Sequence, residues 1–286
     1  MARVTDQTPG GPLAELAREP DERAAYRWLQ AAGWGAARIS SIVALALAWE
    51  LLARSGAFTP FMLPALSAVL ERIWADLISG ELLLNTAVTL YRAVAGFLIG
   101  AVAGMALGMA ISRNATAHWF FDPIISVGFP MPKIAFLPVV MLWLGVYDVS
   151  KITMVSVEAI FPVVTATIAG IRGVERELIW SARNMGAGER ELLWQIAVPA
   201  ALPQIITGLQ VALPIALIVA IVTEMFMGGY GLGGAMNTAS RFADSRGVFA
   251  GIVEIAAIGY ALVKAMSLVR RRLLLWHQEA VTPSAV

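Results

Sequence analysis

Long apolar runs separated by short charged stretches dominate this chain, and they predict the elements that it forms. Six such runs cover residues 39–53, about 85–112, about 123–146, 152–171, about 204–223 and about 248–268. None shows the strict alternation of apolar and polar positions that is typical of barrel strands, and only helices or closed barrels satisfy backbone groups in lipid. The pattern therefore predicts an all-α membrane protein with about six transmembrane helices, the first of which is short and has to borrow flanking residues.

The segments between the runs suggest how the chain is divided. Residues 1–37 are polar and carry mixed charge, so we interpret them as a cytoplasmic tail; residues 38–269 form the transmembrane domain, and residues 270–286 form a second cytoplasmic tail. Residues 55–84 hold a proline-punctuated turn followed by an amphipathic helix, which we place at the membrane surface. One side of that helix carries Val69, Leu70, Ile73, Trp74 and Leu77.

Composition supports a membrane location and narrows the chemistry. Hydrophobic residues make up 58% of the 286 residues and charged residues 14%, and the mean hydropathy is +0.72, well outside the range of soluble domains. The net charge of +1 indicates no nucleic-acid surface. The absence of cysteine excludes disulfides and thiolate metal sites, and two isolated histidines do not form a histidine metal cluster.

The distribution of Lys and Arg predicts the orientation. With the N-terminus inside, thirteen of these residues fall in the inner segments and five in the outer segments. Inner loops carry the excess of positive charge in multi-pass membrane proteins. Both termini and the charged segment 172–203 are therefore expected in the cytoplasm.

Four glycines recur at every fourth position of the second run. Four-residue spacing stacks them near one helix face, where a neighbouring backbone can approach closely. We interpret this ladder as a helix-packing device rather than a contact with solute. It consists of Gly96, Gly100, Gly104 and Gly108.

The charged segment between the fourth and fifth runs is predicted to be a broken helix. Glu175 and Glu177 suit the first turn of a helix, and the glycines at 186–188 interrupt it. A second short helix follows, which Pro199 is expected to end, while Pro203 fits the first turn of the next span. The expected apolar side of the first helix, which would pack on the bundle, is Leu178, Ala182 and Met185. This geometry places a helix-turn-helix across the cytoplasmic mouth, with its turn open to a soluble partner.

At this segment the sequence resembles the permease subunits of bacterial binding-protein-dependent ABC importers. Their cytoplasmic motif reads Glu-Ala-Ala, three residues, Gly, nine residues, Ile, one residue, Leu-Pro. With the glycine aligned on Gly186 the spacing fits throughout. Two positions depart from the motif: Trp180 stands at the Glu position and Val198 at the Leu position. Glu177 is the nearest residue that could substitute for the missing Glu. The resemblance implies that the residues coupling the chain to an ATPase are Ser181, Ala182, Gly186, Ala187, Ile196, Val198 and Pro199.

The likeness extends from about residue 60 to residue 276 and points to the nitrate, sulfonate and taurine branch. Segments such as "FDPIISVGFPMPKIAFLPVVMLWLGVYDVSKI" are similar to that branch. The resemblance implies a type I importer permease in the bacterial inner membrane. It also implies a second permease copy as homodimer partner, two cytoplasmic ATPase subunits and an extracytoplasmic solute-binding protein.

Nucleotide binding is expected on another chain. A Walker A loop requires a lysine directly after a glycine, and none of the three lysines follows a glycine, so the sequence contains no Walker A loop. The lysines are Lys133, Lys151 and Lys264. The chain is thus expected to be a transport subunit rather than an enzyme and to bind no cofactor itself. ATP and Mg belong to the partner ATPase.

Carboxylates and a lysine within the apolar runs are candidates for the pathway or gate. They are Glu158, Glu224, Glu254 and Lys133. Charge within a membrane is costly enough to suggest a function, and a proton-coupled secondary transporter would use such acids as a relay. Glu224 suits gating or loop anchoring as well as solute contact, and Glu158 and Glu254 either face a water-filled path or pair with Lys133 or Lys264. For Arg92 and Lys133 we favour snorkelling or pairing within the bundle.

The sequence limits the solute only to a class. A small organic anion such as an alkanesulfonate or taurine is the first choice that the resemblance implies, and nitrate, an aromatic acid or a vitamin precursor are the alternatives.

Overall fold

The computed structural model describes residues 40–274, and every regular element in this range is a helix. The chain divides into two compact units, with the boundary between Ser67 and Ala68. The predicted N-terminal tail (1–37) lies outside the described residues, as does the predicted C-terminal tail from residue 275 onward. Those predictions therefore stay predictions.

The described part of the first unit is a helix over residues 40–54 followed by a turn-rich segment. Glu50 closes this segment: its carboxylate accepts hydrogen bonds from Arg54 Nε at 2.6 Å, from the Ser67 backbone N–H at 3.1 Å and from Ser67 Oγ at 2.9 Å. Trp49 Nε1 donates to the Pro64 carbonyl at 3.0 Å. Glu50 therefore has a local structural partner within its own unit.

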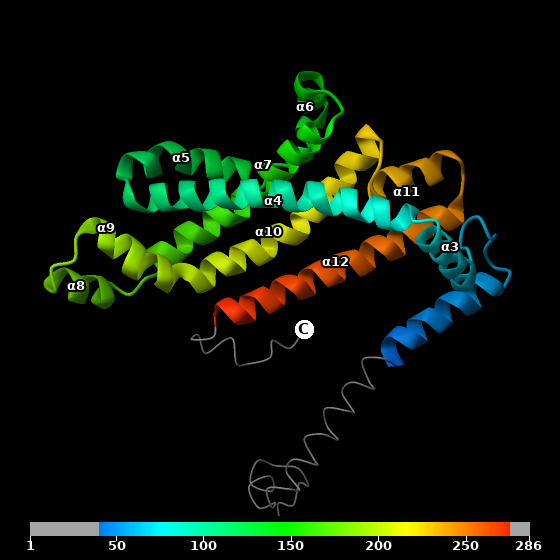
Figure 1. Cartoon of the computed structure of the whole chain (residues 1–286), viewed down its shortest axis with the longest axis horizontal. Coiled ribbons are helices and arrows are strands. Elements are labelled where there is room, and N and C mark those ends of the chain that lie inside the picture. The colour runs from blue at the N-terminus through cyan, green and yellow to red at the C-terminus, as the bar shows by residue number, and fades with distance from the viewer. Residues whose placement is uncertain (1–39, 275–286) are drawn as a thin grey trace, which may run out of the picture. The chain divides into compact units, whose positions relative to one another are not determined.

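The second unit is built on four long helices. They are α4 (Glu81–Arg113), α7 (Asp148–Arg172), α10 (Val198–Met227) and α12 (Ser245–Leu273). Each is long and apolar enough to cross a membrane. In Figure 1, α4, α7 and α10 run past one another at the centre of this unit, and α12 runs beside α10. The core between them is made largely of Ala, Val and Leu side chains, whose small and branched shapes allow the helices to approach closely.

The glycine ladder of α4 lies against α7. A Cβ atom on Gly100 would lie 2.6 Å from the carbonyl oxygen of Ser156, and one on Gly108 would lie 2.6 Å from Thr167 Cβ. Gly96 and Gly104 meet α7 at similarly short distances. The four-residue spacing therefore places the two helix backbones too close together for any side chain at these positions.

The run predicted as one span over 123–146 is two helical pieces. α5 (Ala115–Gly128) is followed by η1 (Lys133–Phe136) and α6 (Leu137–Leu144), and the two pieces are bent by 91°. Pro130 and Pro132 lack an N–H and cannot continue a helix from α5, which explains the break. Counted as one bent span, this pair raises the candidate spans in the described residues to five. The first predicted run, 39–53, is described from residue 40 onward, as the 40–54 helix.

The helix that contains Pro199 does not end there, so that prediction is wrong. α9 (Glu189–Glu191), the π-helical segment η2 (Leu192–Ala197) and α10 form one continuous helix. Pro199 lies in the first turn of α10, directly after the wider π turns, where a shifted hydrogen-bond register accommodates the missing N–H. Pro203 likewise lies inside α10 rather than at the start of a span.

Two shorter helices lie at the end of the second unit where α4 and α12 begin. α3 (Leu66–Ile78) precedes α4, and α11 (Leu232–Arg241) follows α10 after a tight loop. Gly228, Gly229 and Gly231 of that loop have φ values of 71°, 89° and 124°, which favour glycine. On the predicted apolar side of α3 only Val69 is buried, while Trp74 is 63% exposed. This outer side of α3 is therefore free to contact lipid, as a surface helix requires.

Candidate functional site

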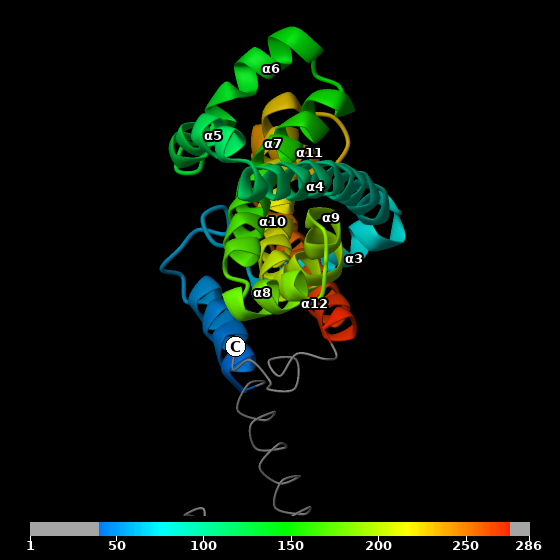
Figure 2. The same ribbon diagram turned by 90° about the vertical axis from the view of Figure 1, so that its left-hand side faces the viewer.

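The helix-turn-helix at one end of the second unit closes with a Schellman motif. After α8 (Arg176–Asn184), Ala187 N donates to the Ala182 carbonyl at 3.0 Å, and Gly186 N donates to the Arg183 carbonyl at 2.9 Å. Gly186 has a φ of 91°, a conformation that side chains rarely adopt. This end of the molecule faces the viewer in Figure 2. Gly186 is thus the residue that permits the reversal of the chain.

Charged groups hold the second arm of this turn. Glu189 accepts from Arg113 Nη2 at 3.0 Å, which ties the turn to the end of α4, and from Arg183 Nη2 at 2.8 Å. Glu191 Oε2 accepts from the Gly188 N–H at 2.9 Å and so caps the helix that begins there. These ion pairs are exposed, so they orient the turn more than they stabilise it.

The outer surface of the turn is apolar. Three apolar residues in and directly after α8 were expected to pack on the bundle. Only Ala182 among them is buried, while Leu178 is 48% exposed and Met185 is 79% exposed. Trp180, at the position of the motif's Glu, is 57% exposed. Apart from Ala182, these apolar side chains of α8 therefore leave much of their surface uncovered by their own chain. Among the other residues of the resemblance motif, Ser181, Gly186 and Pro199 are exposed, and Ala187, Ile196 and Val198 are half-buried.

A buried ion pair lies at the opposite end of the second unit. Arg92 Nη1 donates to Glu224 Oε1 at 2.7 Å, and Arg92 also reaches Asp148 at 2.7 Å and the Tyr230 carbonyl at 2.6 Å. Glu224 is completely buried, and Arg92 is 5% exposed. Of the two expected alternatives for Arg92, the structure has the pairing within the bundle.

The same ion pair holds the loop after α10. Thr89 Oγ1 donates to Glu224 Oε2 at 2.8 Å and accepts from the Leu232 N–H at 2.9 Å. The Gly233 N–H also donates to Glu224 Oε2, at 3.1 Å, and the Gly231 N–H donates to Asn85 Oδ1 at 2.9 Å. Glu224 therefore lies among loop contacts, the arrangement expected of a loop anchor.

The sequence interpretation missed Asn85 and Thr89, although a signal was present. Asn85, Thr89 and Arg92 follow one another at intervals of four and three residues, which places them on one face of α4. A polar stripe of this kind inside an apolar run indicates a buried partner. Asp148 carried no comparable signal, because it stands at the start of a helix, where an acid is common.

Lys133 and Glu158 meet where the bend of the broken span packs against α7. Lys133 Nζ lies 3.2 Å from Glu158 Oε1 and 3.4 Å from the carbonyl oxygens of Phe129 and Met131. It also lies 4.4 Å from the centroid of the Phe161 ring. Of the alternatives open for Glu158, the structure therefore has pairing with Lys133, which fixes the bend.

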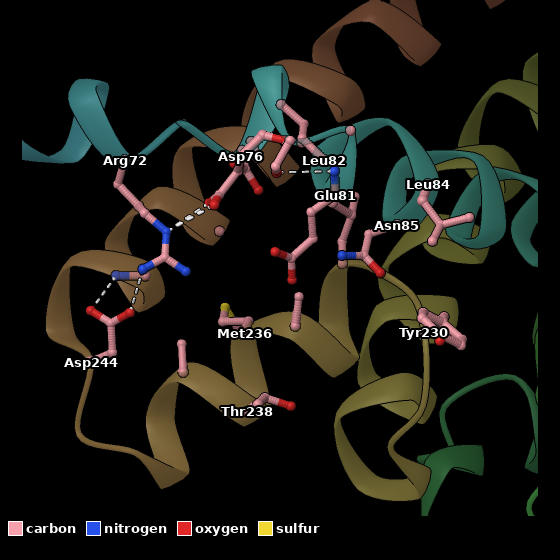
Figure 3. Close-up of a pocket in the computed structure, with 18 of the residues that line it drawn as sticks. Arg72, Asp76, Glu81, Leu82, Leu84, Asn85, Tyr230, Met236, Thr238 and Asp244 are labelled. Atoms are coloured by element: carbon pink, nitrogen blue, oxygen red, sulfur yellow. Dashed lines mark hydrogen bonds and ion pairs between the residues drawn. The ribbon is translucent and has the colours of Figure 1, made fainter. Parts of the chain in front are cut away.

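A pocket of about 780 Å³ opens beside the anchored loop, between α3, α11 and the first turns of α4 and α12. Figure 3 shows Arg72 linked to both Asp76 and Asp244, with distances of 2.9 and 2.7 Å. Although burial disfavours the charged guanidinium, these two acids together raise the pKa of Arg72. Arg72 is the one basic residue among the described residues that line the pocket, and it is paired with two acids.

Two further acids line this pocket without a described ion-pair partner. Glu81 begins α4, and its side chain lies between Asp76 and Asn85 in Figure 3. Glu254 of α12 has a buried Oε1 with no hydrogen-bond partner among the described residues. The structure thus brings Glu254 to the pocket rather than to Lys264, which is exposed further along α12. The pocket is acidic overall and large enough for a small solute.

A bundle of helices long enough to span a membrane, with a helix-turn-helix at one end and a solute-sized pocket at the other, is the architecture of a membrane transport subunit. Residues 96–274 match the family described as "Binding-protein-dependent transport system inner membrane component", and the chain belongs to this family. Its expected role as a transport subunit, rather than an enzyme, agrees with this membership.

Similar sequences come from several organisms. SsuC of Bacillus subtilis (strain 168), named as a permease for aliphatic sulfonates, is 30% identical over 92% of this chain and 93% of its own length. The taurine transport system permease protein TauC of Escherichia coli (strain K12) is 29% identical over 84% of this chain and 90% of its own length. The riboflavin transport system permease protein RibX of Chloroflexus aurantiacus is 29% identical over 88% of this chain and 94% of its own.

Two solved structures share the fold. The MetNI methionine ABC transporter in an inward-facing conformation matches with a TM-score of 0.55 at 20% identity, over 72% of this chain and 96% of the matched chain. An amino acid ABC transporter with histidines matches with a TM-score of 0.58 at 18% identity, over 70% of this chain and 97% of the matched chain. At these identities the likeness concerns the fold, which is that of a type I importer permease.

Proposed function

We propose that two copies of this chain form the translocation pathway of an importer for a small organic sulfonate. The proposal rests on the similarity to SsuC and TauC, which covers most of each chain and which those two names connect with sulfonates. RibX is almost as similar, so riboflavin is the competing solute class.

The observation that supports docking of an ATPase subunit is the exposed apolar surface of the helix-turn-helix. Leu178 and Trp180 of α8 and Met185 at its end are largely exposed, beside a turn that Gly186 permits and Glu189 ties to α4. Exposed apolar side chains beside a tight turn suit a groove on a soluble partner. This partner is an ATPase subunit, which holds the ATP and the Mg, and its movement reaches the membrane through the continuous helix from Glu189 to Met227.

The orientation follows from the charge count. The thirteen-to-five excess of Lys and Arg supports a cytoplasmic location for the helix-turn-helix and both termini, in a protein of the inner membrane. The acidic pocket then faces outward, where a solute-binding protein delivers its cargo. Gly228, Gly229 and Gly231 give the loop beside this pocket its tight course, and the Arg92–Glu224 pair keeps it in place.

The second unit has apolar surface available for a second copy as partner. The most apolar stretch of α12 has no buried residue, and Leu142 and Trp143 of α6 are 83% and 76% exposed. Lipid covers such surfaces as well as protein does, so the area alone does not distinguish the two. A homodimer is the simpler assembly because one chain then supplies both halves of the pathway.

Reconstitution tests the function. The chain is purified with an ATPase subunit, placed in liposomes and supplied with ATP and a binding protein, and uptake of taurine, ethanesulfonate, nitrate and riboflavin is measured. ATP-dependent uptake of a sulfonate is expected. Uptake that needs no ATPase and follows a proton gradient would instead identify a secondary carrier, and uptake of riboflavin alone would refute the sulfonate class.

A further inference from the structure

The two members of the Lys133–Glu158 pair are not equally enclosed. The side chain of Lys133 is 6% exposed and is surrounded by acceptors and by the Phe161 ring, whereas the side chain of Glu158 is 22% exposed. Lys133 binds Glu158 Oε1, and no described residue donates to Oε2. Glu158 is therefore the member with the more exposed side chain and with an acceptor atom, Oε2, that no described donor occupies, whereas Lys133 is enclosed.

The position of Glu158 along α7 indicates what it faces. It lies ten residues after the start of α7 at Asp148, which corresponds to about 15 Å along a helix of 25 residues. Ionisable groups at this depth are rare; they face the bundle interior or a water-filled cavity, pair with one another and mark solute pathways. Solute sites in membrane transporters also lie near this depth and beside interrupted helices. Glu158 meets both conditions, because it packs against the break between α5 and η1.

The charges elsewhere in the outer half of the second unit have a common feature. Each cation there that is embedded in the membrane or lines the pocket contacts an acid or a carbonyl oxygen. These cations are Arg72, Arg92, Lys133 and Lys151. The groups left without a described ion-pair partner there are the pocket acids Glu81 and Glu254. Among the described residues that line the pocket or the Lys133–Glu158 site, a solute that carries only negative charge therefore meets no unpaired cation, whereas a solute with an ammonium group finds carboxylates.

We propose that Glu158 determines specificity by accepting the positively charged amino group of the solute, and that Lys133 positions it. This inference rests on the proposed function and narrows its solute class to zwitterionic aminosulfonates, in preference to alkanesulfonates without an amine. The physical reason is charge balance: the Lys133–Glu158 pair is neutral, and a zwitterion keeps the site neutral. A simple anion would add an uncompensated charge in a region of low dielectric.

Direct binding to the permease tests this. The permease–ATPase complex is placed in lipid nanodiscs without a binding protein, so that the selectivity of that protein does not contribute. Competition between taurine and ethanesulfonate, which differ by the amino group, gives the ratio of their Kd values. A charged hydrogen bond predicts a ratio of roughly ten or more in favour of taurine.

Three variants complete the experiment. Glu158→Gln is expected to reduce the ratio to about one, since a neutral amide cannot stabilise an ammonium as a carboxylate does. Lys133→Met combined with Glu158→Gln is expected to do the same without leaving a buried lysine unpaired, and it replaces the single variant if that fails to assemble. Glu71→Gln, an identical change on the exposed part of α3 outside the pocket, is expected to leave the ratio as in wild type.

Each outcome separates the two proposals. A wild-type complex that binds both solutes equally or binds neither, or a Glu158→Gln complex with an unchanged ratio, would overturn the role of Glu158. The same preparations are tested for ATPase association and for ATP-driven uptake with the binding protein. If these succeed while the Kd ratio does not change, the importer assignment holds and the aminosulfonate inference fails.

Discussion

Removal of the Glu224 carboxylate is expected to release the loop after α10 and to weaken the second unit strongly. Glu224 is completely buried and accepts from Arg92, from Thr89 and from the Gly233 N–H. In Glu224→Ala the Thr89 hydroxyl and the Gly233 N–H lose their acceptor, and Arg92 keeps only Asp148 and a carbonyl oxygen. Breaking a buried ion pair from one side costs about 3–5 kcal/mol.

Milder changes at the same site supply a ranking. Thr89→Val removes one hydroxyl that both donates to Glu224 and accepts from the Leu232 N–H, which is expected to cost about 1–3 kcal/mol. Asp148→Asn affects a carboxylate that is 51% exposed, so the effect is expected to stay below about 1 kcal/mol. The order of destabilisation is therefore Glu224→Ala, then Thr89→Val, then Asp148→Asn.

Two measurements check this ranking. Thermal unfolding of the purified variants in one detergent gives the order of stability, and limited proteolysis reports whether residues 228–244 become accessible. Faster cleavage of this loop is expected for Glu224→Ala and not for Asp148→Asn. If Glu224→Ala melts no earlier than Asp148→Asn and its loop stays protected, the network does not anchor the loop and the reasoning is refuted.

Three further predictions concern the turn, the glycine ladder and the orientation. Gly186→Val is expected to reduce co-purification of the ATPase more than Gly186→Asn, because asparagine tolerates positive φ and no atom lies within 4 Å of the added Cβ; equal effects would show that backbone conformation is not the cause. Gly100→Leu is expected to lower the yield of assembled protein, since its Cβ would meet α7 at 2.6 Å, and a fully stable variant would contradict the packing role. The chain has no cysteine, and Met185 and Phe242 are 79% and 81% exposed, so single cysteines can be introduced at these two positions. They are expected to react with a membrane-impermeant reagent from opposite sides of the membrane. Labelling of both from the same side would disprove the topology.

The sequence by itself determined the features that depend on local spacing. The apolar runs are long enough to require spanning helices, the four-residue glycine spacing requires a flat helix face, and Gly186 with its neighbours requires a turn. These features follow from helix geometry within one segment, so no knowledge of the rest of the chain is needed. The resemblance motif at Gly186 belongs to the same local category, and it was sufficient to predict the family.

Local spacing did not predict how the proline-containing segments behave. Pro199 was expected to end a helix and instead continues it, because the π turns before it shift the hydrogen-bond register. Pro130 and Pro132 were expected within one span and instead accompany a bend of 91°. In both cases the packing of neighbouring helices decides whether the helix continues, bends or ends at the proline. The sequence of the segment alone does not specify that packing.

Only the tertiary structure decided which charges meet. Thr89 and Arg92 reach Glu224 across 135 and 132 residues of chain, and Lys133 rather than Lys264 reaches Glu158. Such pairings depend on how the helices cross and on their axial register, which the close contacts along the glycine ladder set between α4 and α7. A shift of one turn, about 5.4 Å, would bring different side chains together. Each acid could be predicted to need a partner, because an unpaired charge in the membrane is costly, but its identity follows from the packing of helices that are distant in the sequence.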